Sequence, residues 1–262
     1  MPRANREGKV WTREELILAI GLYFVMPWGR IHSHAKEIKA LSRLMRRSPG
    51  ALAMKMGNIG RLDQRLAKRG VGGLSHGGKT EALVWNEFEK RREDLIAEYN
   101  RIRMGLGGRS LPLEDDDVIK APPGLDGVRL AHYRINQSYF RRSVLAAYGG
   151  ACCITGLNDP RLLVASHIKP WSKCASGQDR TVTENGLCLS ALYDRAFDKG
   201  LFTVDVQYKI ALSPSLKDYL TTETYNQHFA LLDNRQIELP TRGRPAVEFL
   251  EYHNNYVFVS RT

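Results

Sequence analysis

The chain has 262 residues, of which 43% are hydrophobic and 26% charged, the composition of a soluble globular protein. This length allows one large domain or two ordinary ones. The longest apolar stretch, Leu16 to Trp28, is too short to span a bilayer and has no small-residue cleavage site after it, so we expect neither a membrane segment nor a secretory signal.

The formal net charge of +11 lies in the first part of the chain. Residues 1–110 contain 22 Lys and Arg against 11 Asp and Glu, whereas residues 111–262 contain 17 of each. Charge segregated in this way is typical of a surface that binds a polyanion. A basic face that serves only solubility is the alternative.

Three helices are expected in the first 60 residues. Thr12 and Glu15 fit a capping box, so the first helix should begin there and run to about Val25. A second helix fits residues 35–45, and Ser48 followed by Pro49 predicts the start of a third that runs to about residue 59. This succession resembles a helix-turn-helix module, and a plain three-helix bundle is the alternative.

The third helix would be the one that approaches DNA, with phosphate contacts from the basic residues beside it. The candidate DNA-binding residues here are Arg46, Arg47, Lys55, Asn58 and Arg61.

Residues 80–103 are expected to form one long charged helix. The stretch rich in Gly, Pro and acidic residues that follows, within residues 105–128, is predicted to be a linker. It would separate a basic helical domain, residues 1–104, from a second domain, residues 129–262.

The second domain is predicted to open with a helix over residues 136–148. A β-hairpin would follow, with strands 151–155 and 162–167, and then a second hairpin with strands 201–205 and 208–212. A strand near residues 236–239 and a helix from Pro245 complete the pattern. The fold class is therefore expected to be α+β.

Four polar residues stand out in the second domain. His167 ends a run of strand-forming residues, and Asn185 opens the next segment. Asp194 and Asp198 lie four residues apart on a predicted helix, so their carboxylates share one face and repel each other. A cation held between the two carboxylates would remove this repulsion.

The segments CITG, ASHIKPW and NGLCLSALYDRAFDKGLF resemble the HNH endonuclease family, in the branch that has aspartates in place of the last histidines. The resemblance covers about residues 136–213. It implies a ββα-metal fold, in which a β-hairpin and a helix clamp one divalent metal ion, and it implies hydrolysis of a phosphodiester bond.

The resemblance also implies roles for individual residues. His167 would be the general base, and Asn185 would fix the loop that orients His167. Asp194 and Asp198 would be metal ligands, and two carboxylates favour Mg²⁺ or Mn²⁺ over Zn²⁺. Ser166 stands where the family commonly has an Asp or His ligand, and its neutral hydroxyl is a weak one.

Two further basic residues, Arg141 and Lys169, are candidates for DNA contacts beside the motif. The four cysteines show no CxxC spacing and are expected to be reduced thiols in a cytoplasmic protein.

Together these features predict a metal-dependent endonuclease of the restriction type that acts on double-stranded DNA. Because one HNH site cuts one strand, cleavage of both strands would need a homodimer or two binding events. Whether modified bases are read is left open. The alternatives are a DNA-binding regulator with a degenerate HNH domain and a nonspecific nuclease.

Overall fold

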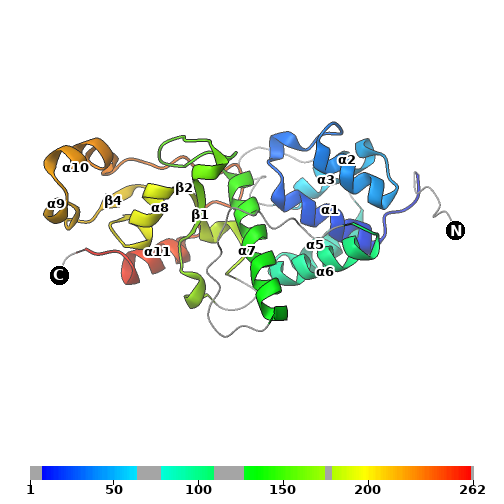
Figure 1. Cartoon of the computed structure of the whole chain (residues 1–262). Helices are drawn as coiled ribbons and strands as arrows, with labels where there is room; N and C mark the ends of the chain where they lie inside the picture. The colour runs from blue at the N-terminus through cyan, green and yellow to red at the C-terminus, as the bar shows by residue number, and fades with distance from the viewer. Residues whose placement is uncertain (1–7, 64–77, 109–126, 175–178, 261–262) are drawn as a thin grey trace. The chain divides into compact units, whose positions relative to one another are not determined.

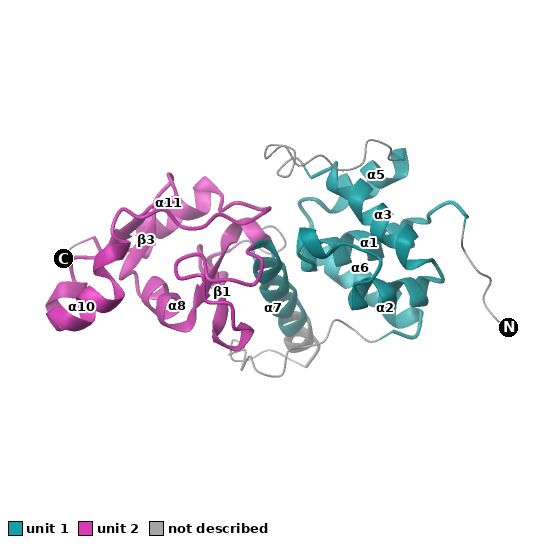
Figure 2. Ribbon diagram, turned by 90° about the horizontal axis from the view of Figure 1, so that it is seen from above, with its two compact units in different colours: residues 1–147, 175–181 teal, residues 148–174, 182–262 magenta. Residues whose placement is uncertain are grey.

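A computed structural model describes residues 8–63, 78–108, 127–174 and 179–260 (Figure 1). Most of the predicted linker, residues 105–128, lies outside these ranges. The described chain divides into two compact units (Figure 2). Unit 1 comprises residues 1–147 and 175–181, and unit 2 comprises residues 148–174 and 182–262. The fold is a mixture of helices and small sheets, in agreement with the predicted α+β class.

Unit 1 is helical and is built around a buried central helix. Its helices are α1 (Arg13–Val25), α2 (Lys36–Met45), α3 (Pro49–Gly60), α5 (Lys79–Phe88), α6 (Arg92–Gly105) and α7 (Gly127–Ala147), with a short 3-10 helix η1 (Trp28–Arg30). Residues 15–25 of α1 are all buried, as expected for a helix that is apolar on every side. It contacts α2, α3, α5, α6 and α7.

The starts of α1 and α3 are those that the sequence predicts. The Thr12 side chain accepts from the Glu15 amide at 3.3 Å, and the Glu15 carboxylate accepts from the Thr12 amide at 2.9 Å, which completes the capping box. The Ser48 hydroxyl accepts from the Ala51 amide at the start of α3. Local hydrogen bonds therefore set these two boundaries.

The single long helix expected over residues 80–103 is instead two helices, α5 and α6. Arg91, with φ −125° and ψ 56°, separates them. One helix of 24 residues would be about 36 Å long, well beyond the reach of the 13-residue α1. The break lets the apolar residues of both halves pack against α1: Trp85, Phe88, Leu95, Ile96 and Tyr99 are all buried.

The helix α7 begins nine residues before the predicted start at residue 136. It packs against α1 and α6 and so belongs to unit 1, whereas the sequence grouped it with the second domain.

Unit 2 contains two small antiparallel sheets surrounded by short helices. Its strands are β1 (Leu163–His167), β2 (Gly186–Ser190), β3 (Phe202–Val204) and β4 (Ile210–Leu212). Its α-helices are α8 (Ala191–Asp198), α9 (Leu216–Tyr219), α10 (Thr222–His228) and α11 (Val247–Tyr256). The 3-10 helices are η2 (Pro160–Leu162), η3 (Trp171–Lys173), η4 (Thr183–Asn185) and η5 (Ala230–Leu232).

The first predicted hairpin was wrong in one strand. The partner of β1 is β2, with Leu163 opposite Ser190 and His167 opposite Gly186. Residues 151–155 form turns, although the Cys153 amide donates to the Cys188 carbonyl of β2 at 2.8 Å. All five residues of β2 are buried, so this apolar run is a strand in the core of the unit.

The second predicted hairpin is confirmed as β3 paired with β4. The strand expected near residue 236 is reduced to one bridge, between Gln236 and Lys209. The cysteines are buried and none of the four forms a disulfide. No helix within the described ranges combines the length and apolar character that a membrane span needs.

Candidate active site

The candidate site is built on β1, β2 and α8, which together form one small motif. The strands β1 and β2 pair along five residues each, and α8 follows β2 without a loop and packs against both strands (Figure 1). The residues singled out in the sequence therefore come from elements in direct contact. His167 and Ser166 lie on β1, Asn185 immediately precedes β2, and Asp194 and Asp198 lie on α8.

The helix α8 ends in a Schellman motif that fixes the position of its last turn. The Leu201 amide donates to the Ala196 carbonyl at 2.9 Å, and the Gly200 amide donates to the Phe197 carbonyl at 2.8 Å. Gly200 has φ +65°, the left-handed conformation that this motif requires. A glycine here thus closes the helix directly after Asp198.

Asn185 is fully buried and clamps the chain where it leaves β1. Its side-chain oxygen accepts from the Lys169 amide at 2.8 Å, and its side-chain nitrogen donates to the Lys169 carbonyl at 3.1 Å and to the Cys174 sulfur at 3.3 Å. Its main-chain carbonyl accepts from the Ile168 amide at 3.0 Å. The hydrogen bonds of this Asn185 clamp reach Lys169, two residues after His167, and so fix the backbone that carries the imidazole.

His167 is the last residue of β1 and lies opposite Gly186. The side chain is half-buried, and its ring packs edge-on against Trp171, with ring centroids 5.5 Å apart. A strand end held by Asn185 on one side and by an aromatic ring on the other gives the imidazole a defined position.

The pKa values of both aspartates of α8 are raised, and the charge of Asp194 contributes to the shift of Asp198. Loss of hydration, followed by the negative charge of Asp194, raises the pKa of Asp198 to about 6. Loss of hydration also raises the pKa of Asp194. The hydrogen bond from Ser166 and the positive charge of Arg195 partly offset this rise. Both carboxylates therefore lie where a nearby positive charge would stabilise their ionised form.

Ser166 is buried and faces the helix that carries the aspartates. Its hydroxyl lies close enough to Asp194 to lower the pKa of that carboxyl, but it makes no hydrogen bond of good geometry with any described residue. A buried hydroxyl without a full partner next to the carboxylate of Asp194, with Asp198 one turn further along α8, is an oxygen-rich donor set that fits a hard divalent cation. Among the described residues, no three His, Cys, Asp or Glu side chains converge on one point.

Three of the candidate DNA-binding residues of unit 1 are tied into the fold. The Arg47 side chain is 2% exposed and contacts Glu15 at 2.9 Å, and its guanidinium also donates to the carbonyls of Lys9 and Val10. Lys55 forms an ion pair with Glu81, and Arg61 lies 3.6 Å from the same carboxylate. These three side chains thus have roles in holding unit 1 together.

The other candidates are more accessible. Arg46 is exposed in the turn before α3, with φ +56°, and Asn58 is half-buried on α3. Arg141 is half-buried on α7 in unit 1, so it lies in a different unit from the β1–β2–α8 motif. Lys169 is half-buried, and its ammonium lies 5.5 Å from the ring centroid of Tyr252.

Two residues of the site were not singled out from the sequence. Cys174 closes the loop after β1, because its thiol donates to the carbonyls of Lys169 and Pro170 at 3.3 and 3.4 Å while its sulfur accepts from Asn185. Trp171 supports the His167 ring. The sequence could have indicated either residue only by its place in the chain, because both lie in the seven residues after His167.

One segment of the chain matches a known protein family. Residues 152–205 match a family model described as HNH endonuclease. No curated protein matches the chain. The matched segment contains β1, β2 and α8 and all five residues of the predicted catalytic and metal-binding set. Over residues 152–205 the chain is therefore similar to the HNH endonuclease family.

Proposed function

We propose that the chain is a metal-dependent endonuclease that hydrolyses phosphodiester bonds of double-stranded DNA. The observation that carries this proposal is the Asn185 clamp. It fixes the exit of β1 beside His167, while α8, the helix that carries the two aspartates, packs against the same pair of strands. A rigid imidazole and paired carboxylates on one small scaffold are the groups that hydrolysis of a phosphodiester needs.

His167 acts as the general base in this proposal. Its imidazole accepts a proton from the water that attacks the scissile phosphorus, since a neutral imidazole is a competent base near pH 7. Asn185 is a positioning residue, because it contacts the backbone after His167 and not the imidazole itself. Its fixed geometry limits how far the base can move from the attacking water.

Asp194, Asp198 and Ser166 would hold the metal ion, and their oxygen atoms favour Mg²⁺ or Mn²⁺. Once bound, the ion would stabilise negative charge on the scissile phosphate and on the leaving oxygen. Because Ser166 is neutral, the ion would depend on the two carboxylates, with water and DNA phosphate as further ligands.

We infer that unit 1 supplies the DNA-binding surface, because the whole net positive charge of the chain falls within residues 1–110. A restriction-type role would join this surface to the nuclease unit. Cutting both strands from one site per chain would require a homodimer or two binding events, and sedimentation on a cleaved duplex tests for the homodimer. Parallel digestion of modified and unmodified DNA tests whether modified bases are read.

The experiment for the nuclease itself is a plasmid nicking assay with Mg²⁺ or Mn²⁺. We expect the wild-type chain to convert supercoiled plasmid to nicked and linear forms, and His167→Ala to leave it supercoiled. Equal nicking by the two proteins would overturn the proposal.

One observation favours a second function, a DNA-binding regulator with a degenerate nuclease unit. Ser166 provides a hydroxyl where a stronger ligand is common, and no third charged ligand converges with the aspartates within the described residues. This reading predicts DNA binding without nicking in either metal. The same plasmid assay, run beside a DNA-binding assay, separates the two functions.

A further inference from the structure

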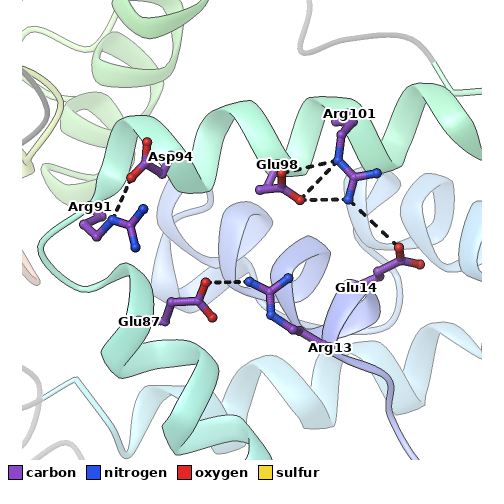
Figure 3. A network of polar contacts seen from close by, with 7 residues as sticks. All are labelled: Arg13, Glu14, Glu87, Arg91, Asp94, Glu98 and Arg101. Atoms are coloured by element: carbon purple, nitrogen blue, oxygen red, sulfur yellow. Dashed lines mark hydrogen bonds and ion pairs between the residues drawn. The ribbon is translucent and has the colours of Figure 1, made fainter.

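Several arginines on the helices of unit 1 form ion pairs with carboxylates. Figure 3 shows one such network, in which Arg13 contacts Glu87 at 2.5 Å and Arg101 contacts Glu98 at 2.8 Å. A hollow of about 550 Å³ in unit 1 is lined by Arg101 but also by Glu14 and Glu15. Its charges are therefore largely balanced.

A second hollow, of about 250 Å³, has a different charge balance. We call it the α2–α7 pocket; it is lined by Leu22, Lys36, Glu37, Ala40, Leu41, Tyr99, Arg103 and Arg142. Three of these side chains are cations and one is an anion. Within the described part of the chain, Lys36, Arg103 and Arg142 form no ion pair with a carboxylate. The carboxylate of Glu37 lies 4.0 Å from Arg30.

Both arginines influence Tyr99, which also lines the pocket. The Arg103 guanidinium donates to the Tyr99 hydroxyl at 3.3 Å, and the charges of Arg103 and Arg142 both oppose the rise in the pKa of Tyr99 that burial causes. The Nε of Arg103 is buried and has no hydrogen-bond partner among the described residues. A buried guanidinium donor without an acceptor is costly, and a bound anion would supply that acceptor.

The start of α2 adds to the positive potential of the pocket. Lys36 and Glu37 are its first two residues, and Ala35 provides no side-chain cap. The first amides of a helix have no partner within the helix, and its macrodipole places partial positive charge at this end. The volume of 250 Å³ is below that of pockets for drug-sized ligands, so the pocket suits a small group such as a phosphate.

We propose that the α2–α7 pocket binds one backbone phosphate of double-stranded DNA, with Arg103, Arg142 and Lys36 as its cationic ligands. The choice of DNA as the source of the phosphate rests on the proposed function. The pocket is lined by residues of α1, α2, α6 and α7 and by none of α3, the helix where the helix-turn-helix resemblance places the contacts. The DNA contact surface of unit 1 therefore extends to a part that the sequence did not indicate.

The test measures binding of a duplex by fluorescence anisotropy in EDTA, with full-length protein carrying His167→Ala so that no cleavage intervenes. Adding Arg142→Gln should weaken binding about tenfold, the loss expected for one hydrogen bond to a charged group. The slope of log K against log salt should become shallower by about 0.9, the value for one phosphate contact. Lys36→Gln should act in the same direction, and because Lys36 is exposed it cannot disturb the core.

Two matched variants make the result specific. Arg43→Gln removes the same charge from an exposed position of α2 outside the pocket, and it should change the salt slope by much less. Glu37→Gln removes the only carboxylate of the pocket and should tighten DNA binding, which a merely structural role of this residue does not predict. Equal effects of Arg142→Gln and Arg43→Gln would overturn the proposal.

A second arm separates DNA from a free phosphate ligand. Inorganic phosphate should raise the melting temperature relative to chloride at equal ionic strength, and Arg142→Gln should abolish this rise. If Arg142→Gln abolished the rise but left DNA affinity unchanged, the pocket would serve a small phosphate ligand and the assignment to DNA would fail. None of these measurements requires cleavage. A negative nicking assay would therefore contradict the nuclease proposal without contradicting the phosphate-binding proposal.

Discussion

The side chain of Asn185 pairs with the backbone of Lys169 through both of its polar atoms. The oxygen accepts from the Lys169 amide at 2.8 Å and the nitrogen donates to the Lys169 carbonyl at 3.1 Å. Only a carboxamide can make both hydrogen bonds at once. This pairing holds the chain two residues beyond the proposed base, His167.

The first prediction concerns Asn185→Asp, which keeps the shape but removes the donor. The new carboxylate would face the Lys169 carbonyl, so the loop should shift and displace His167. We expect the single-turnover nicking rate to fall about 10²-fold, the effect of a misplacement of about 1 Å. DNA affinity in EDTA should stay at the wild-type value, because Asn185 is fully buried and cannot contact DNA. A wild-type nicking rate would contradict the positioning role.

Local features of the chain could be predicted from the sequence, because their causes lie within a few residues. The capping residues Thr12 and Ser48 set the starts of α1 and α3, and the spacing of Asp194 and Asp198 set their common face on α8. The resemblance to HNH endonucleases was confirmed over residues 152–205.

Features that depend on distant partners could not be predicted. The pairing of β1 with β2 spans a loop whose length the pattern does not encode, and a nearer apolar run, residues 151–155, competed for the same role. The break at Arg91 follows from the limited length of α1, which packs against both halves. The burial of Arg47 depends on Glu15, 32 residues away, so a basic residue beside a predicted DNA-reading helix is in fact structural.

Gly200→Ala should destabilise unit 2 through a contact as well as through strain. At φ +65° an alanine costs about 1–2 kcal/mol, and its Cβ would also overlap the carbonyl oxygen of Val257. Gly149 has the same φ of +65° but nothing lies within 4 Å of a Cβ there, so Gly149→Ala carries the strain alone. Chemical denaturation should therefore show a larger loss of unfolding free energy for Gly200→Ala. Equal losses would mean that the chain after α8 moves aside easily.

Arg46 and Arg47 are adjacent in sequence, but substitution should lower the unfolding free energy strongly at Arg47 and hardly at all at Arg46. Arg47→Gln leaves the buried carboxylate of Glu15 without its ion pair, so the unfolding free energy should fall by about 3–5 kcal/mol. Arg46→Gln removes an exposed charge and should change stability by less than about 0.5 kcal/mol. Urea denaturation of the two variants tests this contrast. A stable Arg47→Gln protein would show that the pair contributes little.

His253 should make unit 2 sensitive to acid. It is buried, and burial lowers its pKa to about 4. Its Nε2 donates to the Phe197 carbonyl, because a carbonyl oxygen can only accept. The Nδ1 of the neutral ring therefore accepts from the Thr203 hydroxyl, at a distance of 2.8 Å. Between pH 6.5 and 4 the unfolded chain binds a proton that the folded chain does not, so stability is full above pH 6.5 and falls as the pH drops towards 4.

The loss of unfolding free energy due to His253 should be about 3 kcal/mol, because its pKa is 6.5 in the unfolded chain and about 4 in the folded one. Denaturation of the wild type and of His253→Gln across this pH range isolates the contribution, because glutamine does not titrate. The difference in unfolding free energy between the two proteins should shrink as the pH falls. A constant difference would show that the imidazole is protonated inside the fold without cost.

Asp194→Asn tests the assignment of the metal ligands apart from catalysis. The substitution removes one negative charge and one strong oxygen ligand from the pair on α8, so Mn²⁺ affinity measured by calorimetry should fall by more than about tenfold. Folding should survive, because the change also removes the repulsion of Asp198 that raises the pKa of that carboxyl. Asp218→Asn, at an exposed position of α9, removes the same charge from unit 2 and should leave the titration unchanged. If Asp194→Asn bound Mn²⁺ as the wild type does, Asp194 would not be a ligand.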